Sequence, residues 1–176
     1  IDQSAGGDAV MGLNLRVLTP PSAADVATLQ AFGARHGLAL YLQPGGPDSV
    51  QVLENDPPSP ALQGEPGVLR YSLPAFHLEL ECQPWYFIQI NAAINRQLVE
   101  QASALLEVGP EDRVLDLFCG LGNFTLALAR RAREVVGVEG DASLIDWARR
   151  NAARNGVSNA LFHAADLAGD LTNQPW

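Results

Sequence analysis

The stretch Asp116-Leu-Phe-Cys-Gly-Leu-Gly-Asn-Phe-Thr125 decides the fold of the second half of the chain. It follows the apolar run Val114-Leu115 and precedes a segment of helical composition, 124–133. This order predicts a strand, a glycine turn and a helix, where backbone N–H groups at the helix start can meet a nucleotide-like cofactor. Gly120 and Gly122 let the main chain approach such a ligand, because no Cβ atom stands in the way.

A second apolar strand, 135–138, follows this turn and ends in Glu139. An acidic side chain in this place can accept hydrogen bonds from the ribose hydroxyls of a cofactor. A glycine pair alone is a weak indication of such a site. The turn and the carboxylate together are a specific one.

Strands and helices alternate through this half of the chain. We expect them, in order, at 114–118, 124–133, 135–138, 142–155 and 161–163. Asp141 is suited to begin the second of these helices and Gly156 to end it. Such alternation is typical of a parallel α/β sheet. Because a doubly wound domain has about five or six strands, the pattern predicts only the first half of one.

The residues before position 83 predict a separate small α+β domain without a catalytic constellation. Its expected strands are 13–18, 38–42, 50–53, 68–73 and 76–81. A helix should begin at Ser22, with Asp25 completing a capping box, and end at Gly37. A further helix after Asn91 opens the next segment, with a predicted apolar stripe of Ile94, Leu98, Ala102 and Leu105.

Composition describes an ordinary globular protein, with 47% hydrophobic and 18% charged residues in 176. No apolar run approaches the roughly 18 residues of a membrane span, and no N-terminal signal pattern is present, so we expect a cytoplasmic protein without a membrane partner. Cys82 and Cys119 form no disulfide framework, and the cysteines and histidines suggest no metal site.

The net charge of −9 argues against nonspecific nucleic-acid binding. Residues 1–85 carry a net charge of −6, and residues 86–176 carry −3. Six arginines cluster on the two predicted helices: Arg130, Arg131, Arg133, Arg149, Arg150 and Arg154. We interpret them as solvated helix faces, with phosphate contacts as the alternative.

The 116–125 stretch, together with Phe87-Ile-Gln-Ile-Asn91, resembles the bacterial 23S rRNA (uracil-C5)-methyltransferases. These are S-adenosylmethionine-dependent enzymes related to the tRNA uracil-C5 methyltransferases. The resemblance runs over 7–176 and implies an α/β chain truncated at both ends. Its parts would be the small α+β central domain, 1–82, and the first half of a Rossmann-like methyltransferase domain, 83–176.

The same resemblance implies a function, cofactors and partners. The function would be S-adenosyl-L-methionine-dependent transfer of a methyl group to C5 of a uridine in 23S rRNA. The full-length protein would bind 23S rRNA, and we expect a monomer. A 4Fe-4S cluster and a small RNA-binding barrel are expected only in the N-terminal region that this chain lacks.

The resemblance also implies a set of cofactor-binding residues: Gln89, Phe118, Gly120, Gly122, Asn123, Glu139 and Asp166. Gln89 should reach the methionine end of the cofactor, and Phe118 and Asn123 should line its pocket. Glu139 should bind the ribose hydroxyls, and Asp166 should lie near the adenine amino group.

Most of these residues also have a purely structural interpretation. Gln89 could be a polar residue on the approach to a helix, Asn123 a helix N-cap and Asp166 a loop cap. Phe118 is expected both in the core and in the pocket wall. Glu139 is the best single candidate, because a charge that closes a buried strand requires a partner.

No catalytic residue is expected in this chain. Enzymes of this kind add a cysteine thiolate to C6 of uracil, which makes C5 nucleophilic toward the methyl group, and a base then removes the C5 proton. In the resembling family that cysteine lies in a Ser-Cys-Asn-Pro element, which does not occur before Trp176. Cys119 lies inside the glycine turn, where we expect it to be a small buried hydrophobic residue.

Two other functions remain open. One is an NAD-type Rossmann dehydrogenase fragment, although Thr125 stands where a third glycine or an alanine is expected. The other is a non-catalytic cofactor-binding or interaction module that has kept the pocket.

Overall fold

The computed structural model describes residues 2–3, 11–46, 49–54, 68–89, 91–169 and 174. The chain divides into two compact units. The first contains Ile1–Tyr71 and Cys82–Ala92, and the second contains Ser72–Glu81 and Ala93–Trp176. Residues 72–81 thus belong to the second unit, whereas the residues directly before and after them belong to the first. The domain boundary expected at residue 82 stays a prediction.

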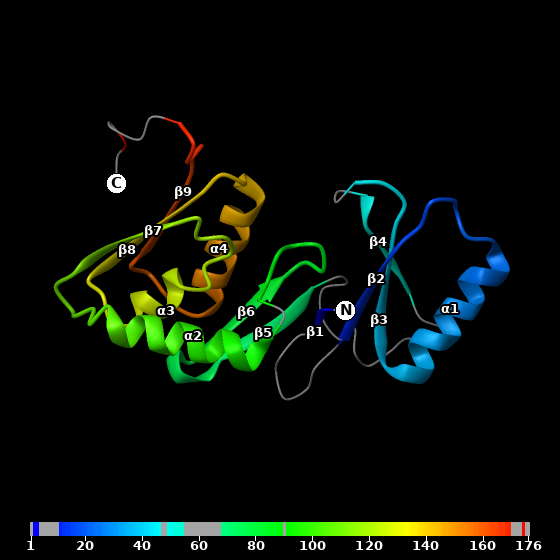
Figure 1. Cartoon of the computed structure of the whole chain (residues 1–176), viewed down its shortest axis with the longest axis horizontal. Helices are drawn as coiled ribbons and strands as arrows, with labels where there is room; N and C mark the ends of the chain where they lie inside the picture. Colours follow the sequence, from blue (N-terminus) through cyan, green and yellow to red (C-terminus); the bar gives the residue numbers. More distant parts are fainter. Residues whose placement is uncertain are drawn as a thin grey trace. The chain divides into compact units, whose positions relative to one another are not determined.

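The first unit contains a four-stranded sheet and one helix (Figure 1). The strands are β1 (Asp2–Gln3), β2 (Met11–Arg16), β3 (Leu38–Gln43) and β4 (Gln51–Leu53), in the order β1-β2-β3-β4. Strands β2 and β3 are parallel and connected by α1 (Ala23–His36), whereas the other two pairs are antiparallel. This arrangement confirms the predicted mixture of helix and strand.

Helix α1 begins and ends where the sequence predicts. The Ser22 side chain accepts from the backbone N–H of Asp25, whose carboxylate accepts in return from the backbone N–H of Ser22. Gly37 ends the helix in the left-handed conformation, with φ of 62°. Both caps use local hydrogen bonds, which is why the sequence alone defines them.

Strands β5 (Leu69–Leu73) and β6 (Leu78–Cys82) form a hairpin. They are joined by a single 3-10 turn over Pro74–Phe76, and His77 follows with a positive φ of 52°. Along both strands buried and exposed residues alternate. The strands expected at 68–73 and 76–81 are therefore present and pair with each other, with the second beginning about two residues later than expected.

The second unit is built on three parallel strands, β7 (Arg113–Leu117), β8 (Glu134–Glu139) and β9 (Ala160–Ala164). They pair in the order β7-β8-β9. Its helices are α2 (Ala92–Leu105), α3 (Thr125–Ala129) and α4 (Ala142–Arg154). This confirms the predicted parallel α/β arrangement, although α3 is shorter than the expected 124–133.

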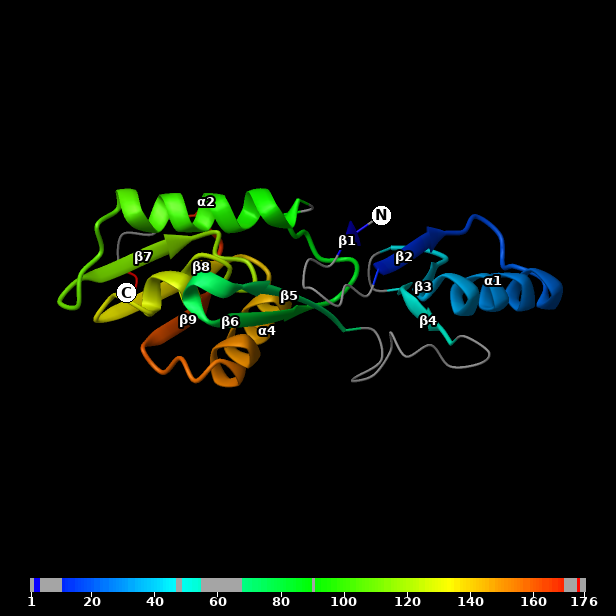
Figure 2. The same ribbon diagram turned by 90° about the horizontal axis from the view of Figure 1, so that it is seen from below.

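Helices α3 and α4 contact this sheet from one side, because right-handed crossovers between successive parallel strands place both helices on the same face. In Figure 2, α2 lies on the β7 side of this unit and α4 on the β9 side. On the opposite face of the sheet Leu115, Leu117 and Leu161 are exposed in the described part of the chain.

The predicted apolar stripe of α2 is wrong. Ile94, Leu98 and Leu105 are exposed, whereas Asn95, Val99 and Ser103 are the buried residues of the helix. Both sets recur about every four residues, so each forms a continuous helical face. The apolar count favours the other face, since two of the three residues on the buried face are polar and Asn95 among them is held by hydrogen bonds to Asn123.

Candidate cofactor site

The glycine turn between β7 and α3 contains three residues with positive φ: Phe118 at 60°, Gly120 at 55° and Gly122 at 97°. At Gly122 a Cβ atom would also lie 3.2 Å from Cγ of Leu126, so this position requires glycine. Phe118 is a bulky residue in the left-handed region. Such strain persists where the surrounding structure holds it, and it is concentrated at functional sites.

The two ends of the turn are bound to each other and to the neighbouring strand. Thr125 Oγ1 donates to Asp116 Oδ2 at 2.5 Å, which joins the end of β7 to the first residue of α3. Burial raises the pKa of Asp116, and the hydrogen bond from Thr125 opposes this shift. The backbone N–H of Cys119 donates to the carbonyl of Val138 at 3.0 Å, which ties the turn to β8.

Glu139 ends β8 and holds the turn from the other side. Its Oε2 accepts from the N–H of Gly120 at 3.2 Å, and its Oε1 accepts from the N–H groups of Gly140 at 2.7 Å and Asp141 at 3.2 Å. The negative charge of Glu139 is thus compensated by three backbone N–H groups. The side chain remains partly exposed, so a ligand can reach it.

Two asparagines from different helices complete the support of the turn. The amides of Asn95 on α2 and Asn123 in the turn exchange two hydrogen bonds, of 2.9 and 3.1 Å. From α4, Asn151 Nδ2 donates to the carbonyl of Leu121 at 3.2 Å. The alternative role of Asn123 as a helix N-cap is not observed: the N-cap of α3 is Phe124, which makes no side-chain cap bond.

The structure brings together five of the predicted cofactor residues, namely Phe118, Gly120, Gly122, Asn123 and Glu139. Phe118 is 72% exposed, so the expectation that it also belongs to the core is wrong. The cofactor contacts themselves stay predictions.

For the other two predicted residues, Gln89 and Asp166, the structure shows local surroundings only. Asp166 Oδ1 accepts from the N–H of Ala168 at 2.9 Å, which is a loop cap. Gln89 is exposed and belongs to the first compact unit. Their assigned roles toward the adenine and the methionine end of a cofactor also stay predictions.

Cys119 is buried behind the turn. A Cβ atom at Gly137 would lie 2.9 Å from its Sγ, so the strand passes directly against the thiol. Burial, together with the charges of Asp116 and Glu139, raises the pKa of Cys119 to about 12. The thiol is therefore protonated at neutral pH, which makes it a poor nucleophile.

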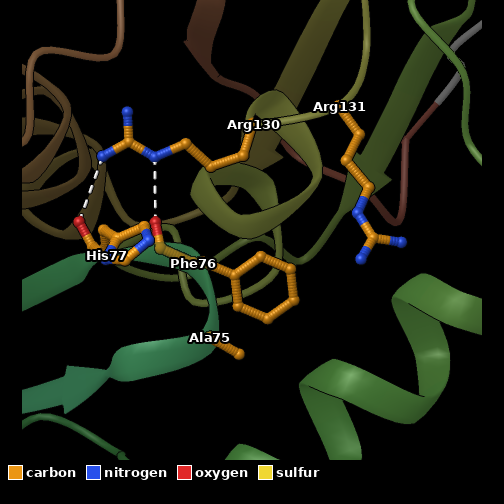
Figure 3. Close-up of a pocket in the computed structure, with 5 residues that line it drawn as sticks. All are labelled: Ala75, Phe76, His77, Arg130 and Arg131. Atoms are coloured by element: carbon orange, nitrogen blue, oxygen red, sulfur yellow. Dashed lines mark hydrogen bonds between the residues drawn. The ribbon is translucent and has the colours of Figure 1, made fainter.

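An open pocket of about 440 Å³ lies beyond α3, at the end remote from the glycine turn. Figure 3 shows its lining residues, Ala75, Phe76, His77, Arg130 and Arg131. The Arg130 guanidinium donates to the carbonyls of Phe76 and His77, so it is engaged in holding the hairpin. Arg131 lies over the Phe76 ring, with Cζ 5.9 Å from the centroid.

The residues missed from the sequence are Asn95, Asn151 and the Asp116–Thr125 pair. Asn95 and Asn151 act through contacts between residues that are distant in sequence. Asp116 and Thr125 lie closer together, at the two ends of the 116–125 stretch. One signal was available for α4, since Asn151 lies inside the helix, where asparagine is not favoured, and Asn155 follows four residues later at the C-cap.

Within the described segments, no helix is long and apolar enough to cross a membrane. Over the same residues, no group of three or more His, Cys, Asp or Glu side chains could hold a metal ion.

The parallel sheet, the strained glycine turn and the acidic residue that ends the next strand define a Rossmann-like domain of the nucleotide-cofactor-binding class. A sequence model of the tRNA (uracil-5-)-methyltransferase family matches residues 77–172, more than half of the chain. The chain belongs to this family.

Curated relatives are similar over nearly the whole chain. It is 51% identical over 177 residues to the 23S rRNA (uracil(1939)-C(5))-methyltransferase RlmD of Xanthomonas euvesicatoria pv. vesicatoria, covering 100% of this chain and 37% of the relative. It is 52% identical over 170 residues to the protein of the same name from Stenotrophomonas maltophilia, covering 97% of this chain and 36% of the relative. The chain thus spans little more than a third of the length of these relatives.

Two solved structures share the fold. The tRNA (uracil-54, C5)-methyltransferase of Pyrococcus abyssi, in complex with S-adenosyl-L-homocysteine, aligns with a TM-score of 0.55 and 21% identity, over 77% of this chain and 32% of that one. The putative transferase PH0793 of Pyrococcus horikoshii aligns with a TM-score of 0.57 and 16% identity, over 94% and 55%.

Proposed function

We propose that this chain is the cofactor-binding part of an enzyme that transfers a methyl group from S-adenosyl-L-methionine to C5 of a uridine in 23S rRNA. The observation that carries the proposal is the hydrogen bond between the glycine turn and Glu139, in which the N–H of Gly120 donates to the carboxylate. Family membership and the names of the curated relatives support the reaction and the substrate.

The residues around the turn fit this cofactor. The partly exposed carboxylate of Glu139 can accept from two ribose hydroxyls while its backbone partners hold it in place. Gly120 offers backbone without a Cβ atom, and the exposed Phe118 ring offers an apolar wall. Gln89 and Asp166 would bind the methionine and adenine ends, respectively.

The cofactor, when bound, supplies an electrophilic methyl group on a sulfonium sulfur. The residues of this chain bind and orient it, and they do not activate uracil. Cys119 cannot serve as the attacking thiolate, because its raised pKa of about 12 keeps it protonated and its side chain is buried. The nucleophile and base would come from the part of the enzyme outside this chain.

Several properties of the longer protein belong to the same proposal. It would bind 23S rRNA, carry a 4Fe-4S cluster in a region outside this chain, and act as a cytoplasmic monomer. Cys82 and Cys119 are both buried and do not belong to a cluster of possible metal ligands in the described ranges. The family resemblance supports these properties.

Isothermal titration calorimetry with S-adenosyl-L-homocysteine and with NAD tests the proposal. We expect binding of the former only. Glu139→Ala should weaken that binding at least tenfold, since a hydrogen bond to a charged group contributes about 1.5–3 kcal/mol. Glu134→Ala is the matched control, because Glu134 lies at the other end of β8 and pairs with Arg113. Tighter binding of NAD, or equal affinities of Glu139→Ala and the wild type, would overturn the assignment.

A further inference from the structure

The outer edge of strand β6 is covered by side-chain amides of helix α4. Asn151 Oδ1 accepts from the N–H of Glu81 at 2.8 Å, and its Nδ2 donates to the carbonyl of Glu81 at 3.0 Å. One helical turn later, Asn155 makes the same pair of bonds with Glu79, at 2.9 and 2.8 Å. Each amide therefore replaces the two hydrogen bonds that a neighbouring strand would make.

The spacing of the two elements explains this match. Four residues of α-helix rise about 6 Å, and two residues of strand span about 6.6 Å. Asn151 and Asn155 thus meet alternate residues of β6 in register. Arg154 adds ion pairs with the side chains of Glu79 and Glu81 on the same strand.

Only one of the two asparagines also contacts the glycine turn. Asn151 is fully buried, and its Nδ2 makes a further hydrogen bond to the carbonyl of Leu121 at 3.2 Å. The additional bond of Asn155 Nδ2 goes instead to the carbonyl of Asn151, within the helix. Asn151 therefore links three elements: helix α4, the edge of β6 and the turn that precedes α3.

We propose that Asn151 is a positioning residue for cofactor binding. Its amide fixes the Leu121 carbonyl, and through it the backbone that carries Gly120 and Gly122. Loss of the amide leaves that carbonyl without this donor, in a turn that already holds strained φ angles. The turn then occupies its binding conformation for a smaller fraction of the time, and the apparent affinity falls by that fraction.

This inference rests on the proposed cofactor site. Asn155 binds β6 but makes its further bond within the helix, so loss of its amide should weaken the contact with the hairpin without moving the turn.

The test compares Asn151→Ala with Asn155→Ala in the full-length protein, using titration with S-adenosyl-L-homocysteine and thermal unfolding without ligand. Both variants lose a matching pair of bonds to β6, so both should lower the melting temperature. Asn151→Ala should raise the Kd about tenfold, whereas Asn155→Ala should leave it within about twofold. A purely structural role would give the two variants the same Kd.

The outcomes separate this inference from the proposed function. If the wild type does not bind S-adenosyl-L-homocysteine, the proposed function fails. If the wild type binds and the two variants keep equal Kd values, only the role of Asn151 is overturned. If Asn151→Ala does not fold, Asn151→Ser takes its place, because serine keeps a polar group but is too short to reach the Leu121 carbonyl. Asn151→Ser should also raise the Kd. An unchanged Kd for this variant would overturn the inference.

Discussion

Cys119 shows how the position of a residue controls its chemistry. It is one of two cysteines in this chain, and its side chain is buried next to the glycine turn. Burial, then the nearby carboxylates of Asp116 and Glu139, raise its pKa from 9.0 to about 12. Each of these effects disfavours the charged form of the thiol.

We predict that Cys119 resists alkylation in the folded protein. At pH 8 a pKa of about 12 leaves roughly a thousandfold less thiolate than a pKa of 9, and the thiolate is the reactive form. Peptide mapping after iodoacetamide treatment measures this, with the urea-unfolded protein as the reactive control. Rapid, stoichiometric labelling of Cys119 in the folded state would contradict the assignment of an inert, buried thiol.

The same raised pKa fixes the direction of a pH effect on stability. A group whose pKa is higher in the folded state stabilises that state below its unfolded pKa and loses this contribution as pH rises. For Cys119 the loss falls between pH 9 and about 12.

At the scale of elements, the β5–β6 hairpin is held by α4 on its edge and by Arg130 at its tip. Arg130 donates to the carbonyls of Phe76, His77 and Asn155, which brings three chain segments together. Figure 3 shows the first two of these contacts and the separate course of Arg131. These bonds to backbone groups add to the burial of the hairpin's apolar side chains, such as Leu78 and Leu80.

We predict that Arg130→Ala lowers the free energy of unfolding by roughly 1–3 kcal/mol, since it removes charged donors from three carbonyls. Arg131→Ala is the matched control. It loses a cation–π contact with Phe76, which contributes about 0.5–1 kcal/mol at an exposed site. Urea unfolding of both variants measures the difference. Equal values would show that the Arg130 contacts do not stabilise the hairpin.

These elements also show what the sequence could predict. The alternating strands and helices of 113–164, and the caps at Ser22 and Asp141, depend on local patterns and were predicted correctly. The side-chain hydrogen bonds that hold the glycine turn could not be predicted, because Asn95 and Asn151 bond to residues 28 and 30 positions away in the chain. The buried face of α2 is missed for a related reason: it contains Asn95, whose partner is the amide of Asn123, and an apolar count does not detect such a contact.

At the scale of the whole molecule, charge limits how this chain can meet RNA. The net charge is −9, and most of the six clustered arginines are engaged within the protein. Arg130 and Arg149 donate to carbonyls, Arg154 pairs with Glu79 and Glu81, and Arg150 lies over Trp147. All six side chains are exposed, as the interpretation of solvated helix faces expects, and the absence of phosphate contacts stays a prediction.

We predict that the 176-residue chain does not bind an rRNA hairpin in a salt-sensitive manner at physiological ionic strength. Counterion release requires cations that contact phosphates, and the chain offers few such groups on these helices. Fluorescence anisotropy between low and high salt is the measurement. Submicromolar affinity that falls steeply with salt would contradict the prediction and assign the arginine cluster to RNA.

The central claim is that this chain holds the cofactor of a uracil-C5 methyltransferase. Transfer of a methyl group to C5 replaces the C5 hydrogen, so a 23S rRNA transcript with tritium at C5 of its uridines reports the reaction atom by atom. With S-adenosyl-L-methionine and the full-length protein, we predict one tritium released for each methyl group transferred, 5-methyluridine as the product, and slower release for Glu139→Ala at limiting cofactor. Methyl transfer without tritium release, or no transfer by a protein that binds the cofactor, would contradict the claim.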